Sequence, residues 1–296
     1  MTELITQTVT PTTHDLGQFE VRRVLPSKAR QMVGPFIFVD EFGPGQLDIG
    51  TGMDVRPHPH INLATVTWLF QGAIDHRDTL GTFSTIRPGT VNLMTAGRGI
   101  AHSERSPEDE RKKGPMLYGM QTWLALPDGQ EEIDPAFEAV SDLPWIEDNG
   151  VKACVIMGEL WGKRAATTTH ADTIYSEILL GPNGSIPIDS KADERAVMLV
   201  GGEATIGNCT LTPYELAVLK PGETMTLSSE SGGRVMLLGG EAFTTRRHVW
   251  WNFVSSDRER INQAKDDWRE GRFGKVPGDE GEFIPLPDVP KTVSYP

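Results

Sequence analysis

The chain has 296 residues, enough for two domains of ordinary size. Its 41 acidic and 28 basic residues give a formal net charge of −13, which argues against direct binding to nucleic-acid phosphates or an anionic membrane surface. The sequence has no run of 18 apolar residues and no basic-then-apolar signal pattern. Its two cysteines, Cys154 and Cys209, are too far apart to suggest a ligand pair or a disulfide framework. We therefore expect a cytoplasmic protein with reduced thiols and with neither nucleic acid nor membrane as a direct partner.

Short strands joined by turns are predicted throughout the first half of the chain. Apolar runs alternate with turns that contain glycine and proline, of which the chain holds 31 and 21. We expect strands over residues 19–25, 35–42, 62–70, 73–77, 83–87, 91–95 and 117–126. No helix longer than a turn or two is expected before residue 135, so this half is predicted to be all-β.

An acidic, proline-rich stretch over 127–150 is predicted to be a linker between two domains. Strands are expected to resume after it, over residues 151–159, 174–180, 195–200, 216–219 and 235–238. We therefore predict an N-terminal domain over 1–135 and a C-terminal domain over 136–296.

The pattern changes to helical after Gly240. Ser256-x-x-Glu259 has the form of a capping box, and Ile261, Ala264 and Trp268 form one apolar helical stripe. Gly271 is expected to end this helix, and the proline- and glycine-rich tail is expected to be extended.

Two pairs of polar residues have the spacing of a ligand-bearing strand. They are His58-x-His60, which is flanked by Pro57 and Pro59, and His102-x-Glu104, which follows a Gly-x-Gly corner. Residues two apart on a strand point to the same face, about 6.5–7 Å apart, so two neighbouring strands would bring three imidazoles and a carboxylate together. This donor set suits one divalent first-row transition metal with positions left open, and ligand type alone does not choose among the metals.

Two further polar residues have weaker claims to this site. His76, in Asp75-His76-Arg77-Asp78, follows the turn after the first ligand strand. It either lies near the site or is a turn histidine paired with one of the two aspartates. Gln121, on the long strand over 117–126, is either a polar group of the pocket or a structural hydrogen-bonding residue.

The second half of the chain repeats the pattern of the first. Residues 88–97 align with 213–222 without a gap, and 68–72 resemble 198–202. In this alignment His58 and His60 correspond to Ile188 and Ser190, and His102 and Glu104 to Leu227 and Ser229. We therefore predict two copies of one domain, of which only the first holds metal ligands.

These motifs resemble the signature of the pirin family, within the cupin superfamily. The resemblance extends over both halves and is concentrated in Pro57-His58-Pro59-His60, His76-Arg77-Asp78, Pro88-Gly89 and the run from Met94 to Glu104. It implies an all-β bicupin fold, with two jelly-roll-like β-barrels in tandem and a short C-terminal helical segment.

The resemblance also implies a metal in the N-terminal barrel, held by His58, His60, His102 and Glu104. The implied metal is Fe(II), with Mn, Ni, Co, Cu and Zn as alternatives. Many pirins have a glutamate at the position of Ala64, so one carboxylate near the metal is missing here.

Three functions follow as hypotheses. The first is a dioxygenase similar to quercetin 2,3-dioxygenases, which would open the ring of a flavonol with O2, with Glu104 as the catalytic base. The second is an iron-dependent redox-sensing regulator that binds a transcription factor or a metabolic enzyme. The third is a metal-binding bicupin without turnover.

Overall fold

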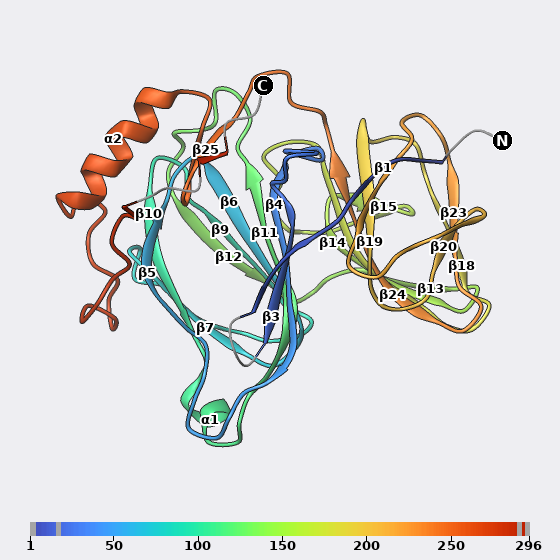
Figure 1. The fold of residues 1–296 in the computed structure, drawn as a ribbon, viewed down its shortest axis with the longest axis horizontal. Coiled ribbons are helices and arrows are strands. Elements are labelled where there is room, and N and C mark those ends of the chain that lie inside the picture. Colours follow the sequence, from blue (N-terminus) through green and yellow to red (C-terminus); the bar gives the residue numbers. More distant parts are fainter. Residues whose placement is uncertain (1–3, 16–18, 289–291, 294–296) are drawn as a thin grey trace. The chain divides into compact units, whose positions relative to one another are not determined.

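The computed structural model describes residues 4–15, 19–288 and 292–293, which form mainly antiparallel strands (Figure 1). These residues divide into two compact units. The histidine unit comprises described residues within 14–21, 42–141 and 244–296, and the companion unit those within 1–13, 22–41 and 142–243. The C-terminal helix and the described part of the tail thus belong to the histidine unit, whereas the predicted second domain, over 136–296, includes them. The domain boundary at residue 135 stays a prediction.

The elements of each unit are short. The histidine unit contains β5 (Asp54–His60), β6 (Leu63–Gln71), β7 (Ile74–Asp78), β8 (Phe83–Ile86), β9 (Val91–Thr95), β10 (Ile100–Arg105), α1 (Glu108–Arg111), β11 (Met116–Ala125), β12 (Ala136–Val140), β25 (His248–Trp250), β26 (Phe253–Ser255), α2 (Arg258–Arg269) and β27 (Thr292–Val293). The companion unit contains β1 (Ile5–Val9), β13 (Trp145–Asp148), β14 (Val151–Met157), β15 (Glu159–Leu160), β16 (Lys163–Arg164), β17 (Thr173–Leu180), β18 (Ser185–Ile188), β19 (Glu194–Gly202), β20 (Thr205–Ile206), β21 (Cys209–Thr210), β22 (Leu216–Leu219), β23 (Met225–Ser228) and β24 (Gly233–Gly240). A boundary between the units falls within each of β2 (Thr12–Asp15), β3 (Glu20–Leu25) and β4 (Phe36–Gln46).

The two main sheets of each unit are one large and one small antiparallel sheet, as expected for a jelly-roll-like barrel. The histidine unit also contains the sheet β26-β25-β27, and the companion unit contains the strand pair β15-β16. The small sheet of the histidine unit has the order β5-β10-β7-β8, and its large sheet includes the run β12-β9-β6-β11-β4. The companion unit has β18-β23-β20-β21 and β1-β22-β19-β24-β17-β14-β13. The all-β prediction is confirmed, and every strand predicted above is present, with β4 continuing furthest beyond its predicted end.

The strand orders also confirm the internal repeat. The run β9-β6-β11 corresponds to β22-β19-β24, and β5-β10-β7-β8 corresponds to β18-β23-β20-β21. One detail of the alignment is wrong. Ile186 lies opposite Leu227 in the companion unit, as His58 lies opposite His102, so the equivalents of His58 and His60 are Ile186 and Ile188. The second barrel therefore has apolar residues where the first has histidines.

The stretch over 127–150 is not a continuous linker. β12 pairs with β9, from Ala136 opposite Thr95 to Val140 opposite Val91, and β13 pairs with β14. Both strands lie at the edge of their sheets, and neither has a fully buried residue. The acidic residues of β13, Glu147 and Asp148, are exposed. The acidic, proline-rich composition of this stretch is that of a linker, but the stretch contains two paired strands.

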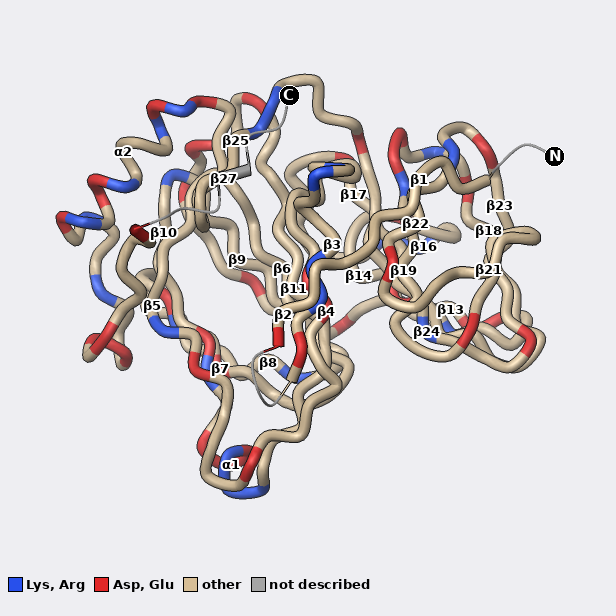
Figure 2. Tube along the Cα trace, viewed as in Figure 1, with Lys and Arg blue, Asp and Glu red and all other residues tan. Residues whose placement is uncertain are grey.

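Helix α2 buries the predicted stripe of Ile261, Ala264 and Trp268. The stripe joins a core that includes Ile61 and Ala101, the residues next to two of the predicted ligands. Figure 2 shows acidic and basic residues interspersed along the rest of this helix.

The ends of α2 agree only in part with the prediction. Asp257 rather than Ser256 is the N-cap, because its side chain accepts a hydrogen bond from the backbone N–H of Glu259. The backbone N–H of Ser256 instead donates to Glu131 at 2.7 Å. Gly271 follows the C-terminus with a φ of +71°, a conformation that favours glycine, as predicted.

Candidate metal centre

Two adjacent strands bring three histidines together in the interior of the histidine unit. β5 and β10 pair antiparallel, with His102 directly opposite His58, which confirms the predicted neighbouring strands. The relative exposures of His58, His60 and His102 are 6%, 1% and 1%. Alternation along the strands places these side chains on one face and Pro57 and Ala101 on the other.

The three imidazoles converge on one point. Their ligand nitrogens all lie within 4.8 Å of one another. The Nε2 atoms of His60 and His102 are 3.1 Å apart, and the ring centroids of His58 and His102 are 4.4 Å apart. The ring of Trp123 packs edge-to-face against that of His60, with the ring centroids 5.0 Å apart, and so lies beside the three histidines.

Backbone carbonyls fix the tautomers of the two histidines on β5. His58 Nδ1 lies 2.9 Å from the carbonyl oxygen of Arg56, and His60 Nδ1 lies 3.1 Å from that of Asn252. A carbonyl oxygen only accepts, so each Nδ1 carries the proton and each Nε2 keeps its lone pair. Metal-binding histidines commonly donate the N–H of the ring nitrogen that does not bind the metal to such an acceptor.

Burial keeps the imidazoles neutral. It lowers the pKa of His58 to about 4, although the hydrogen bond to the carbonyl oxygen of Arg56 acts in the opposite direction. Burial also lowers the pKa of His60 and of His102 well below the usual value, and the neighbouring histidines add to this shift. Neutral imidazole is the form that binds a metal.

The residues present fit a divalent transition metal. The Nε2 atoms of His60 and His102 face each other at 3.1 Å in a region that is shielded from water, and among the described residues no anionic group belongs to this group of three histidines. A cation at the point of convergence would be coordinated by borderline-soft nitrogen donors.

Glu104, the fourth predicted ligand, lies on the same strand but outside the group of three histidines. Its carboxylate is buried, and burial raises its pKa. Gln121 Nε2 lies 3.5 Å from Glu104 Oε1, and Gln121 Oε1 accepts a hydrogen bond from Thr67 Oγ1 at 2.7 Å. Gln121 is thus a polar neighbour of the candidate base. The roles of Glu104 as ligand and as base stay predictions.

His76 combines the two interpretations that its sequence left open. Its Nε2 lies 3.0 Å from Asp78 Oδ2, and its Nδ1 lies 3.4 Å from His102 Nδ1. His76 is therefore paired with an aspartate and is also in contact with a predicted ligand. The signal in the sequence was a third pair with strand spacing, His76-x-Asp78, on the strand that adjoins β10.

The cysteines have no part in this centre. Both belong to the companion unit, and both are free. Burial, together with the nearby carboxylate of Glu177, raises the pKa of Cys154 to about 12, so this thiol is unreactive at neutral pH.

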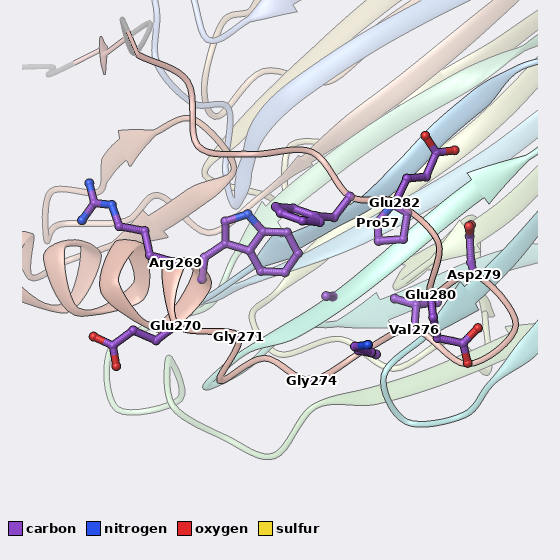
Figure 3. Close-up of a pocket in the computed structure, with 13 residues that line it drawn as sticks. Pro57, Arg269, Glu270, Gly271, Gly274, Val276, Asp279, Glu280 and Glu282 are labelled. Atoms are coloured by element: carbon purple, nitrogen blue, oxygen red, sulfur yellow. The ribbon is translucent and has the colours of Figure 1, made fainter.

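A separate pocket of about 370 Å³ lies on the opposite face of β5 and β10 (Figure 3). Pro57 and Ala101 line it together with residues of α2 and of the C-terminal tail, including Trp268 and Phe283. The backbone N–H of Ile284 donates to the carbonyl oxygen of Pro57 at 2.8 Å, which holds the tail along β5. The two faces of the same strands thus have different surroundings.

Comparisons with known proteins agree with this arrangement of two barrels. The family model for pirin matches residues 18–124, and the model for the pirin C-terminal cupin domain matches residues 175–274. A pirin-like protein of Caulobacter vibrioides is 45% identical over 279 residues, which cover 93% of this chain and 96% of that relative. The chain belongs to the pirin family.

Two further relatives are named for an enzymatic activity. A Pseudomonas aeruginosa protein that is provisionally named a quercetin 2,3-dioxygenase is 37% identical, in an alignment that covers 93% of this pirin and 87% of that relative. The crystal structure of a quercetin 2,3-dioxygenase from Acinetobacter baumannii is 33% identical, with a TM-score of 0.90 over 98% of this chain and 97% of that one. Within the described residues of this pirin, no helix has the length and apolar character that a membrane span requires.

Proposed function

We propose that this pirin is a metal-dependent dioxygenase that opens the ring of a flavonol such as quercetin, with O2 as the second substrate. The observation that carries the proposal is the convergence of ring nitrogens from three buried imidazoles inside one barrel. The names of relatives at 37% and 33% identity supply the substrate class.

In this proposal His58, His60, His102 and Glu104 hold one divalent metal. Fe(II) is our first choice, and Mn, Ni, Co, Cu and Zn are alternatives. The bound metal would supply Lewis acidity and a template for the reacting oxygen atoms. The His60 ring is held from behind by the Asn252 carbonyl and from the side by Trp123, which keeps its lone pair aimed at the centre.

Glu104 is the proposed base for the flavonol hydroxyl. Burial raises the pKa of this carboxylate, so it binds a proton more readily than an exposed glutamate does. The amide of Gln121, itself fixed by Thr67, orients the carboxylate and releases it easily because their contact is long, at 3.5 Å. Ala64 in place of an acid leaves Glu104 as the proposed proton acceptor.

The test is oxygen consumption with quercetin by protein loaded separately with each of the six metals. We expect turnover with at least one metal. Glu104→Gln should reduce it by about 10²- to 10⁴-fold, because the general base is removed while its shape is kept. Glu147→Gln, on an exposed edge strand of the companion unit, is the matched control. Absence of oxygen consumption with quercetin and related flavonols for every metal would refute the proposed substrate class.

A further inference from the structure

The carboxylate of Asp78 is held as an acceptor at the far end of a buried polar chain. Its Oδ1 accepts the backbone N–H groups of Leu80 at 2.9 Å and Thr82 at 3.1 Å. Its Oδ2 faces His76 Nε2 at 3.0 Å. An ionised carboxylate only accepts hydrogen bonds, so the proton of a neutral His76 lies on Nε2.

That proton position determines the next link of the chain. With its proton on Nε2, His76 offers the lone pair of Nδ1 as an acceptor toward His102 Nδ1, 3.4 Å away. A hydrogen bond along this contact requires the proton of His102 on Nδ1, which leaves its Nε2 with a lone pair. This Nε2 is the atom that faces His60 Nε2 at the point of convergence.

We infer that His76 and Asp78 are positioning residues, which set the tautomer of His102 and so present its Nε2 to a metal. The inference rests on the metal centre proposed above. The same tautomer of His58 and His60 is set by backbone carbonyl oxygens, whereas Nδ1 of His102 faces the side chain of His76.

Packing holds this chain in one arrangement. The exposed fractions of His76 and Asp78 are 3% and 0%, so water does not compete for their hydrogen bonds. The ring of His76 stacks on Phe137 with centroids 4.6 Å apart and planes 25° apart. Strand pairing adds a second restraint, because Asp78 lies directly opposite His102 on β10.

The substitution Asp78→Asn should reverse the direction of the hydrogen bonds from residue 78 through His76 to His102, with little change in side-chain shape. The N–H groups of Leu80 and Thr82 hold the amide oxygen on their side, so the amide NH2 points at His76 Nε2. His76 must then accept at Nε2 and donate from Nδ1, which moves the proton of His102 onto Nε2 and blocks that ligand. Asp75→Asn, on the same strand with its carboxylate bound to Thr85, is the matched control.

Two substitutions of His76 separate hydrogen bonding from packing. His76→Phe keeps a ring stacked on Phe137 but offers no acceptor to His102. His76→Gln can donate to Asp78 from its amide nitrogen and accept from His102 at its amide oxygen, which reproduces the tautomer found in the wild type.

The first measurement is the tautomer of His102 in metal-free protein, from long-range ¹H–¹⁵N spectra of ¹⁵N-histidine-labelled chains, with the signal assigned by its loss in His102→Ala. We expect the proton on Nδ1 in the wild type and in His76→Gln, and on Nε2 in Asp78→Asn. A wild-type His102 with its proton on Nε2 overturns the inference without any reference to metal.

The second measurement is Ni(II) affinity, by competition with a chromogenic chelator, on variants whose thermal unfolding confirms that they are folded. Asp78→Asn and His76→Phe should bind Ni(II) about 10- to 100-fold more weakly than the wild type, with little change for His76→Gln and Asp75→Asn. Equal affinity of Asp78→Asn and wild type overturns the positioning role. A wild type that takes up no Ni(II) refutes instead the metal centre, and the tautomer measurement then still decides the inference.

Discussion

Trp268 anchors helix α2 and the C-terminal tail to the outer face of the strands that carry the metal ligands. Its side chain is 8% exposed and packs in one core with Ile61 and Ala101. Its ring makes edge-to-face contacts with Phe273 at 5.8 Å and Phe283 at 5.7 Å, and its Nε1 donates to the carbonyl oxygen of Ile284 at 2.9 Å. Trp268→Ala removes all of these interactions at once.

The expected cost is about 3–5 kcal/mol, the usual range for truncation of a buried Trp to Ala. Trp268→Phe should cost less, about 1–3 kcal/mol, since a ring is kept while the Ile284 carbonyl loses its donor. Because 1.4 kcal/mol corresponds to a factor of ten, the alanine variant should open α2 roughly two to four orders of magnitude more often.

Hydrogen–deuterium exchange of peptides that cover 258–269 measures this opening directly. The rate is read under conditions where reclosing is faster than exchange, with Trp145→Ala, on an edge strand and 38% exposed, as the control. Equal exchange of α2 in Trp268→Ala and wild type would show that the tail is held by other contacts, and the reasoning from burial would be wrong.

Three further predictions test other parts of the histidine unit. In metal-free protein, the unfolded state binds a proton at His58 near pH 6.5 and the folded state only near pH 4, so acidification across this window should cost about 3 kcal/mol of stability through His58 alone. In denaturant titrations at several pH values, His58→Leu should lose this share of the dependence and keep the share of His60 and His102. Arg247→Ala should destabilise the unit by about 2–4 kcal/mol in the same titrations, because the buried guanidinium binds the carbonyl oxygen of Leu126 and the carboxylate of Asp128. Arg246→Ala, at the exposed neighbouring position, should change stability little. Gly97→Ala should abolish Ni(II) uptake, because at this φ of +49° a Cβ atom would collide with the carbonyl oxygen of Ile133. Gly129→Ala, at a φ of +79° with open space around it, is the control and should retain uptake. Normal uptake by Gly97→Ala would contradict the steric argument.

Strand periodicity predicted much of the fold and the centre of the site. Strands such as β6 and β9 are buried on both faces, and their apolar residues, interrupted by Thr65, Thr67 and Asn92, are bounded by turns that contain glycine or proline. The pairs at His58 and His102 were visible because their spacing is a property of the strand itself. The edge strands β12 and β13 were not predicted, since none of their residues is buried and both lie in an acidic, proline-rich stretch.

The surroundings of the histidines could not be derived in the same way. Whether His76 reaches His102 depends on the pairing of β7 with β10, and the repeat alignment missed the correct equivalents of His58 and His60 because register is set by hydrogen bonding between strands. The carbonyl behind His60 belongs to Asn252, which no local pattern connects with it.

That last contact has a consequence for the order of events during synthesis. His60 and Asn252 are 192 positions apart, and the tail that runs along β5 is made later still. When the first barrel leaves the ribosome, all three ligand histidines are present, but the carbonyl that aims His60 has not yet been translated. A nascent chain arrested before residue 244 should therefore hold metal more weakly than the finished protein, and full loading should follow release of the whole chain.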